Sequence, residues 1–234
     1  MSLTYSILAL GAHPDDLEFG CGAVLLKERT RGTRLTLAIS SRGEAGTAGT
    51  PEEREDEARA ASQMLGVPDG PVFLDFGGDG QQRETPENAL QLARLIRRIQ
   101  PDLVLAPLPC ENQHPDHTVV GRLARTACRQ ARYGGLLRDL PRHSVQGLWF
   151  YSITHESPLD GAVLVDISAQ VEDWKRLMHC HQTQVQSRAY VDLQLSRARQ
   201  WGLRAGCEHA LALWPNDPPR LDYLTDLPYS ARSF

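Results

Sequence analysis

The stretch SILALGAHPDD, residues 6–16, decides the fold of this chain. It begins with a continuous apolar run, which is typical of a strand buried on both faces of a sheet. The run gives way at once to a polar loop that contains His13, Asp15 and Asp16. In open α/β sheets, ligands bind beyond the carboxyl ends of the strands. The stretch therefore predicts a central strand and places a candidate functional site at its end.

Outward from this stretch, apolar segments of strand length alternate with amphipathic segments of helix length. We expect further strands at residues 35–38, 72–74, 103–106, 148–152 and 163–165, and helices at 23–31, 51–65, 86–99, 117–131, 171–180 and 197–207. This alternation predicts a Rossmann-like α/β fold, in which helices cover both faces of a mostly parallel sheet. The arginines at positions 94, 97 and 98 are expected on the solvated face of their helix.

The length fits one domain, for which we take residues 1–214. Residues 215–234 form a tail rich in proline and aspartate. We expect this tail to cover the surface or to meet a neighbouring subunit, and we therefore expect a homo-oligomer.

Composition excludes several classes of protein. Of the 234 residues, 41% are hydrophobic, which is typical of a globular protein and not of a disordered one. The net charge of −4 disfavours a dedicated nucleic-acid binder, which usually carries a basic excess. We find neither a signal-peptide pattern nor an apolar run of about 18 residues, so no membrane association is expected. The five cysteines are irregularly spaced and form no CxxC pair, which favours reduced thiols in the cytoplasm.

A second polar loop, His114-Pro115-Asp116-His117, follows the predicted strand at 103–106. The fold places both polar loops at the same edge of the sheet. A catalytic zinc needs three protein ligands and leaves a position open for water, and further groups must then act as base and as electrostatic stabiliser. The loops supply enough candidates for both tasks: His13, Asp15, Asp16, His114, Asp116 and His117.

The alternative is that these are two ordinary polar loops. Two adjacent carboxylates at the end of a buried strand argue against it, because like charges repel unless a cation neutralises them. The sequence therefore predicts a metal site.

Three regions of the chain resemble the PIG-L/LmbE-like zinc-dependent de-N-acetylases. AHPDDLEFGCG at residues 12–22 resembles their first motif, and HPDH at residues 114–117 resembles their second. SRGEAGT at residues 41–47, followed by Glu53, Arg54 and Glu57, is similar to their third region. Residues 165–168 and 197–202 resemble the branch that deacetylates the glucosaminyl-malate precursor of bacillithiol.

The resemblance implies a role for each matching residue. His13, Asp16 and His117 match the ligands of a zinc ion, although Fe²⁺ could occupy such a site in cells. Asp15 matches the general base that takes a proton from the water that zinc acidifies. His114 matches an imidazole that stabilises the oxyanion, which we expect in its charged form, and Asp116 lies where it could orient that ring.

Two arginines are expected to bind the substrate. Arg54 matches an arginine that holds the sugar in related enzymes. Arg188 lies where the related branch places contacts to the aglycone, and a guanidinium suits the paired carboxylates of malate.

The sequence is thus interpreted as a zinc-dependent hydrolase that removes an acetyl group from an N-acetylglucosamine-type substrate, with N-acetylglucosaminyl-malate expected. The alternatives are a deacetylase of another N-acyl amino sugar or small molecule, and a non-catalytic metal- or sugar-binding protein on the same fold. Retention of Asp15 beside a complete ligand set argues against the non-catalytic alternative. Nucleotide binding is disfavoured, because the chain has neither GxGxxG nor GxxxxGK.

Overall fold

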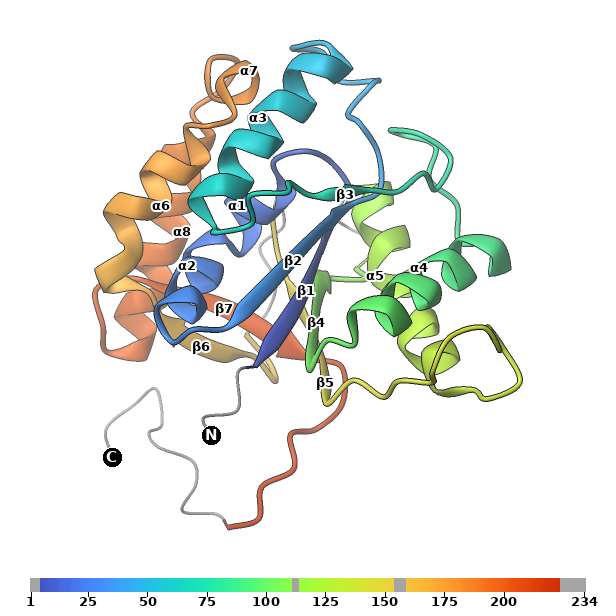
Figure 1. Cartoon of the computed structure of the whole chain (residues 1–234). Helices are drawn as coiled ribbons and strands as arrows, with labels where there is room; N and C mark the ends of the chain where they lie inside the picture. Colours follow the sequence, from blue (N-terminus) through green and yellow to red (C-terminus); the bar gives the residue numbers. More distant parts are fainter. Residues whose placement is uncertain (1–4, 111–113, 154–158, 224–234) are drawn as a thin grey trace.

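A single mixed sheet organises the chain in the computed structural model, which describes residues 5–110, 114–153 and 159–223 (Figure 1). Over these residues the sheet has seven strands in the order β3-β2-β1-β4-β5-β7-β6. The strands are β1 (Ser6–Gly11), β2 (Arg34–Ile39), β3 (Val72–Phe73), β4 (Leu103–Pro107), β5 (Gly147–Tyr151), β6 (Val163–Asp166) and β7 (Ala210–Pro215).

The strand β1 lies at the centre of the sheet, as its apolar sequence predicts. Every one of its residues is buried, and it pairs in parallel with β2 on one side and β4 on the other. The register sets Ala9 opposite Leu105 of β4, so the carboxyl ends of β1 and β4 lie side by side. The two polar loops that follow these strands therefore start from adjacent points of the same edge.

Helices pack against both faces of the sheet. The helices are α1 (Asp16–Gly20), α2 (Gly22–Thr30), α3 (Pro51–Met64), α4 (Pro86–Ile99), α5 (Pro115–Arg132), α6 (Val171–Met178), α7 (Gln182–Val185) and α8 (Tyr190–Ala205), with a 3-10 turn, η1 (Ser168–Gln170). Figure 1 shows α4 and α5 together on one side of the sheet and α2, α6 and α8 on the other. The predicted α/β fold with a mostly parallel sheet is confirmed. None of the helices within the described ranges is long and apolar enough to cross a bilayer.

The last strand, β7, is absent from the sequence-based prediction. It runs antiparallel to both β5 and β6, and its apolar residues are buried. It therefore lies between these two strands and joins β6 to the rest of the sheet. The helices α1 and α7 were also not predicted, because each is too short to show a helical period. The division into a domain at 1–214 and a tail at 215–234 remains a prediction, and residues 224–234 lie outside the described ranges.

A glycine on α5 brings this helix close to the end of β4. A Cβ atom at Gly121 would lie 2.4 Å from the carbonyl oxygen of Pro107 and 2.9 Å from the nitrogen of Pro109. Any larger residue would force the helix away from the sheet. Gly121 follows His117 by four residues and therefore shares its helix face. The close approach thus helps to fix the position of His117.

One expectation about the arginines of α4 is wrong. Arg94 and Arg98 lie toward solvent, but Arg97 is only 2% exposed. Its guanidinium donates hydrogen bonds to the carbonyl oxygens of Ala131, Leu136, Leu137 and Leu140, and so holds the end of α5 and the loop after it. Helical spacing alone could not reveal this, because the partners are backbone groups of a distant loop.

We expect Arg97→Met to lower the free energy of unfolding by about 3 kcal/mol, because it removes the charged donor that several carbonyl oxygens at the end of α5 and in the loop after it share. For a domain of this size that loss corresponds to roughly 6–12 °C in Tm. Thermal unfolding followed by circular dichroism measures the change. The matched control is Arg98→Met on the exposed face of α4, which should change Tm little. Equal effects of the two substitutions would contradict the role given to Arg97.

Candidate functional site

The first polar loop is organised around the carboxylate of Asp16. Its Oδ2 atom accepts hydrogen bonds from the backbone N–H groups of Ala12, at 2.8 Å, and His13, at 2.9 Å. Its Oδ1 atom lies 3.0 Å from Nε2 of His117, which comes from the first turn of α5. One buried carboxylate therefore joins the loop after β1 to the helix after β4, as the topology predicts.

His13, Asp16 and His117 form a group that could hold a metal ion. All three are buried, and each offers a ligand atom that lies within 4.8 Å of the other two. A set of two imidazoles and one carboxylate is typical of catalytic zinc sites, which leave a further position open. The donors present thus fit the metal that the sequence predicts.

Burial and the attraction between opposite charges shift the pKa values of Asp16 and His13. Burial alone would raise the pKa of Asp16, but the imidazoles of His117 and His13 hold it well below its ordinary value. Burial alone would lower the pKa of His13, but the carboxylates of Asp16, Asp116 and Asp79 raise it well above its ordinary value. Without a metal, the carboxylates around His13 therefore favour the protonated form of its ring. A cation that binds to this ring must displace the proton.

Asp15 lies beside this group without belonging to it. Its side chain faces the cavity next to the guanidinium of Arg54, whose Nη2 lies 3.7 Å from Asp15 Oδ2. Burial and the neighbouring carboxylate of Asp16 raise the pKa of Asp15 to about 6, despite the opposing effect of Arg54. The backbone of Asp15 has φ 120°, a conformation that residues with a side chain rarely adopt. Such a carboxyl group can exchange protons near neutral pH.

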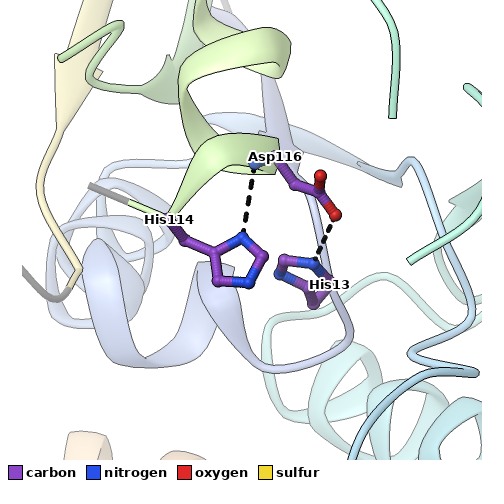
Figure 2. A group of neighbouring side chains, drawn as sticks. All are labelled: His13, His114 and Asp116. Atoms are coloured by element: carbon purple, nitrogen blue, oxygen red, sulfur yellow. Dashed lines mark hydrogen bonds and ion pairs between the residues drawn. The ribbon is translucent and has the colours of Figure 1, made fainter. Parts of the chain in front are cut away.

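The second loop places His114 at the N-cap of α5, with Pro115 at the first helical position. Nδ1 of His114 accepts the backbone N–H of Asp116 at 3.3 Å, as Figure 2 shows. Partial burial of its ring and the neighbouring rings of His13 and His117 lower the pKa of His114. A neutral ring that accepts at Nδ1 carries its proton on Nε2. The structure therefore favours a neutral His114 instead of the imidazolium expected from the sequence.

The carboxylate of Asp116 contacts His13 and not the ring of His114. Its Oδ2 atom lies 3.1 Å from Nε2 of His13 (Figure 2). The same atom accepts the backbone N–H of Gly80 at 2.7 Å. Asp79 approaches the same nitrogen of His13, with its Oδ1 at 2.9 Å. Carboxylates in this position fix the orientation of a histidine whose other nitrogen can bind a metal. Asp116 thus orients His114 only through its backbone and directs its side chain to His13.

A second group of possible ligands shares His13 with the first. It consists of His13, His114 and Asp116, the residues drawn in Figure 2. His114 is exposed in this group, whereas the first group is buried throughout. The two groups can be told apart experimentally, because only one contains His117.

Arg54 is buried more deeply than expected for a residue that holds the sugar. It is 4% exposed, and its guanidinium donates to the carbonyl oxygens of Gly43, at 3.0 Å, and Pro14, at 2.9 Å. Its Nε atom has no hydrogen-bond partner among the described residues. A Cβ atom at Gly43 would lie 2.1 Å from Arg54, so the glycine makes room for the guanidinium. Arg54 therefore ties two loops together beside Asp15.

A cavity of about 690 Å³ lies over these residues, within the range usual for small-molecule sites. His13, Asp15, Asp16, His114 and His117 line its base, together with Arg54 and Asp79. Its other walls are formed by residues 45–47 and by residues from 184 to 194, among them Arg188. All predicted site residues except Asp116 thus line one cavity, and Asp116 lies behind His13.

Sequence reasoning missed the apolar part of this wall. Phe19 of α1 packs edge-on against the ring of Tyr190, at 5.9 Å between centroids, and the guanidinium of Arg188 lies over the same ring. Tyr190 begins a helix that sequence analysis starts at residue 197, and so its position in the site could not be predicted.

Comparison with known proteins gives a consistent result. Residues 8–128 match the family described as GlcNAc-PI de-N-acetylase (PIG-L). A diacetylchitobiose deacetylase of Thermococcus kodakarensis is 30% identical over 193 residues, which cover 76% of this chain and 69% of that protein. The crystal structure of a conserved protein of Thermus thermophilus superposes with a TM-score of 0.83 at 34% identity and covers 92% of this chain and 96% of that one.

A third similar structure belongs to a protein with another activity. It is the 4-carboxy-2-hydroxymuconate hydratase of Pseudomonas putida, with a TM-score of 0.82 at 21% identity, covering 94% of this chain and 100% of that one. At this identity the likeness shows the fold alone.

We expect His117→Ala to weaken binding of Zn²⁺ to the metal-free protein by at least ~10²-fold, since removing a ligand should cost more than the ~10–100-fold typical of an outer partner. Isothermal titration calorimetry with ZnCl₂ measures the affinity. His114→Ala is the matched control and should keep the affinity within a few-fold. The opposite result, with binding lost in His114→Ala and kept in His117→Ala, would assign the metal to the second group.

Proposed function

The chain belongs to the GlcNAc-PI de-N-acetylase family, and from this premise we propose that it is a metal-dependent hydrolase that removes the acetyl group from an N-acetylglucosamine-type substrate. The observation that carries the proposal is the pairing of a buried His13–Asp16–His117 group with Asp15, a carboxyl group beside it with a pKa of about 6. Such an arrangement supplies a ligand set and a separate base, which amide hydrolysis requires.

The proposed reaction adds the oxygen of water to the acetyl carbonyl carbon and then breaks the C–N bond, giving acetate and a free amine. When bound to His13, Asp16 and His117, a divalent cation, for which we propose Zn²⁺, polarises the carbonyl and acidifies water. Asp15 accepts the proton of the attacking water and later delivers it to the leaving nitrogen. The Nε2–H group of neutral His114 donates a hydrogen bond to the oxyanion of the tetrahedral intermediate. Asp116 and Asp79 hold the ring of His13.

For the substrate we propose N-acetylglucosaminyl-malate, the precursor used in bacillithiol synthesis. Support comes from the size of the cavity and from Arg188, an exposed arginine on its wall that suits a dicarboxylate. Arg54, which lines the cavity beside Asp15, is proposed to contact the sugar. All five cysteines are unpaired, which supports our proposal of a cytoplasmic enzyme. The homo-oligomer expected from the sequence remains a prediction.

A hydratase is the alternative that the fold permits, because a similar fold serves that activity in Pseudomonas putida. The two functions differ in their product. Acetate released from N-acetylglucosaminyl-malate, N,N′-diacetylchitobiose or N-acetylglucosamine, and abolished by chelation, supports the deacetylase. Absence of acetate from all three substrates with Zn²⁺ present would overturn it.

Asp15→Asn should keep Zn²⁺ and lose at least ~10²-fold in kcat, the usual contribution of a positioned general base. In the wild type, kcat/KM should fall toward acid pH with a midpoint at or below about 6, because protonated Asp15 cannot accept a proton and a nearby cation lowers its pKa further. Acetate release across pH measures both effects. Asp16→Asn is the contrasting variant and should lose the metal as well. Near-normal turnover of Asp15→Asn would assign the base to another group.

Arg188→Ala should raise KM for N-acetylglucosaminyl-malate by about tenfold or more, since a hydrogen bond to a charged group contributes ~1.5–3 kcal/mol. Turnover of free N-acetylglucosamine should be unchanged, because it lacks the malate. Steady-state kinetics on both substrates provide the measurement. Arg204→Ala, an exposed arginine at the far end of α8, is the control. Equal losses on the two substrates would argue against recognition of malate by Arg188.

A further inference from the structure

The outer wall of the cavity is built from a segment of which the proposed function uses only Arg188. Residues 181–190 contain α7 and lead into α8, and from this segment Gln184, Arg188, Ala189 and Tyr190 line the cavity. The facing loop contributes residues 45–47. The separation between segment and loop sets the width of the cavity between them.

Glu57 of α3 holds this segment with both oxygens of its carboxylate. The backbone N–H of Thr183 donates to Oε1 at 2.8 Å, and the hydroxyl of Thr183 donates to Oε2 at 2.7 Å. Hydrogen bonds to a charged acceptor are roughly twice as strong as neutral ones. Glu57 does not itself line the cavity, so it acts on the site through Thr183.

The facing loop is joined to the same segment. The side-chain amide of Gln184 donates to the carbonyl oxygen of Ala48 at 3.2 Å. Gly49 packs beneath Thr183, where an added Cβ atom would lie 2.6 Å from the methyl carbon of that residue. Glu57 therefore anchors the point at which the two walls of the cavity meet.

A second buried carboxylate holds the start of the segment. His181 is fully buried, and its Nε2 lies 3.1 Å from Oε2 of Glu18, close enough for an ion pair although the atoms are not aligned for a hydrogen bond. Glu18 lies on α1, two residues beyond Asp16. Residues 181–184 are thus attached to α1 by one carboxylate and to α3 by another. Of the two, Glu57 can be changed without touching the metal loop.

We propose that Glu57 is a positioning residue for substrate specificity. By holding Thr183, it fixes the wall that contacts the substituent on the amino sugar and leaves the metal group unaffected. The proposal rests on the proposed deacetylase function. It assigns a task to Glu57, a residue of the third sequence region that metal binding and proton transfer do not explain.

The test uses two variants that weaken the same contact from opposite sides. Glu57→Gln leaves one acceptor oxygen for two donors, and Thr183→Val removes the hydroxyl while keeping shape and backbone. In each single variant, amide hydrogen exchange of residues 183–190 should become about tenfold faster. The double variant should exchange little faster than either single variant, because both substitutions weaken the same contact. Asp56→Asn, the exposed neighbour on α3, is the matched control and should leave exchange unchanged.

Kinetics on the same variants separate specificity from chemistry. KM for the conjugated N-acetylglucosaminide that the wild type hydrolyses best should rise about tenfold, whereas kcat, Zn²⁺ content and the KM for free N-acetylglucosamine should not change. Unchanged exchange and an unchanged ratio of the two KM values would overturn the role of Glu57 alone. Loss of metal and of kcat on both substrates would show a structural role instead. A wild type that releases acetate from neither substrate would overturn the proposed function, and the specificity role with it.

Discussion

The carboxylate of Asp16 is the contact on which the site depends. It accepts two backbone N–H groups of the loop after β1 and reaches the imidazole of His117 on α5, so two segments about a hundred residues apart are joined at one buried anion. A buried charge is costly unless it is paired and hydrogen-bonded, and here both oxygens are engaged. The parallel register of β1 and β4 and the close approach of Gly121 to Pro107 bring the two segments within reach.

Much of the architecture could be predicted because apolar runs and turns have strong local signals. The strand at Ser6–Gly11 and the helix at Pro86–Ile99 match their predictions closely, and the parallel arrangement follows from the alternation of the two kinds of element. Two of the three elements that were missed lack such a signal, because the helices α1 and α7 are single turns. The third, β7, does carry an apolar run of strand length, which the sequence-based prediction left out.

The gathering of the candidate site residues was predictable for a similar reason, whereas their hydrogen-bond partners were not. Residues in the segments that follow the two central strands, such as His13 after β1 and His117 at the start of α5, come together because the sheet topology requires it. The partners of Asp116 could not be foreseen, because the loop that contains Asp79 and Gly80 approaches from elsewhere in the sheet. The enclosure of Arg54 also depends on distant carbonyl oxygens. Local sequence reports which groups are present near a site but not how their hydrogen bonds are shared.

The backbone of Asp15 has a consequence for how this protein can change. A residue with a side chain at φ 120° carries strain of the order of 1–3 kcal/mol, which glycine would relieve. Selection for stability alone would therefore favour glycine at this position, whereas the proton transfer that we propose requires the carboxylate. The fold keeps a locally unfavourable conformation at the place where a carboxyl group faces the cavity. With the role that we propose for Asp15, stability and activity are opposed at a single residue, where glycine would raise stability at the expense of the proposed reaction.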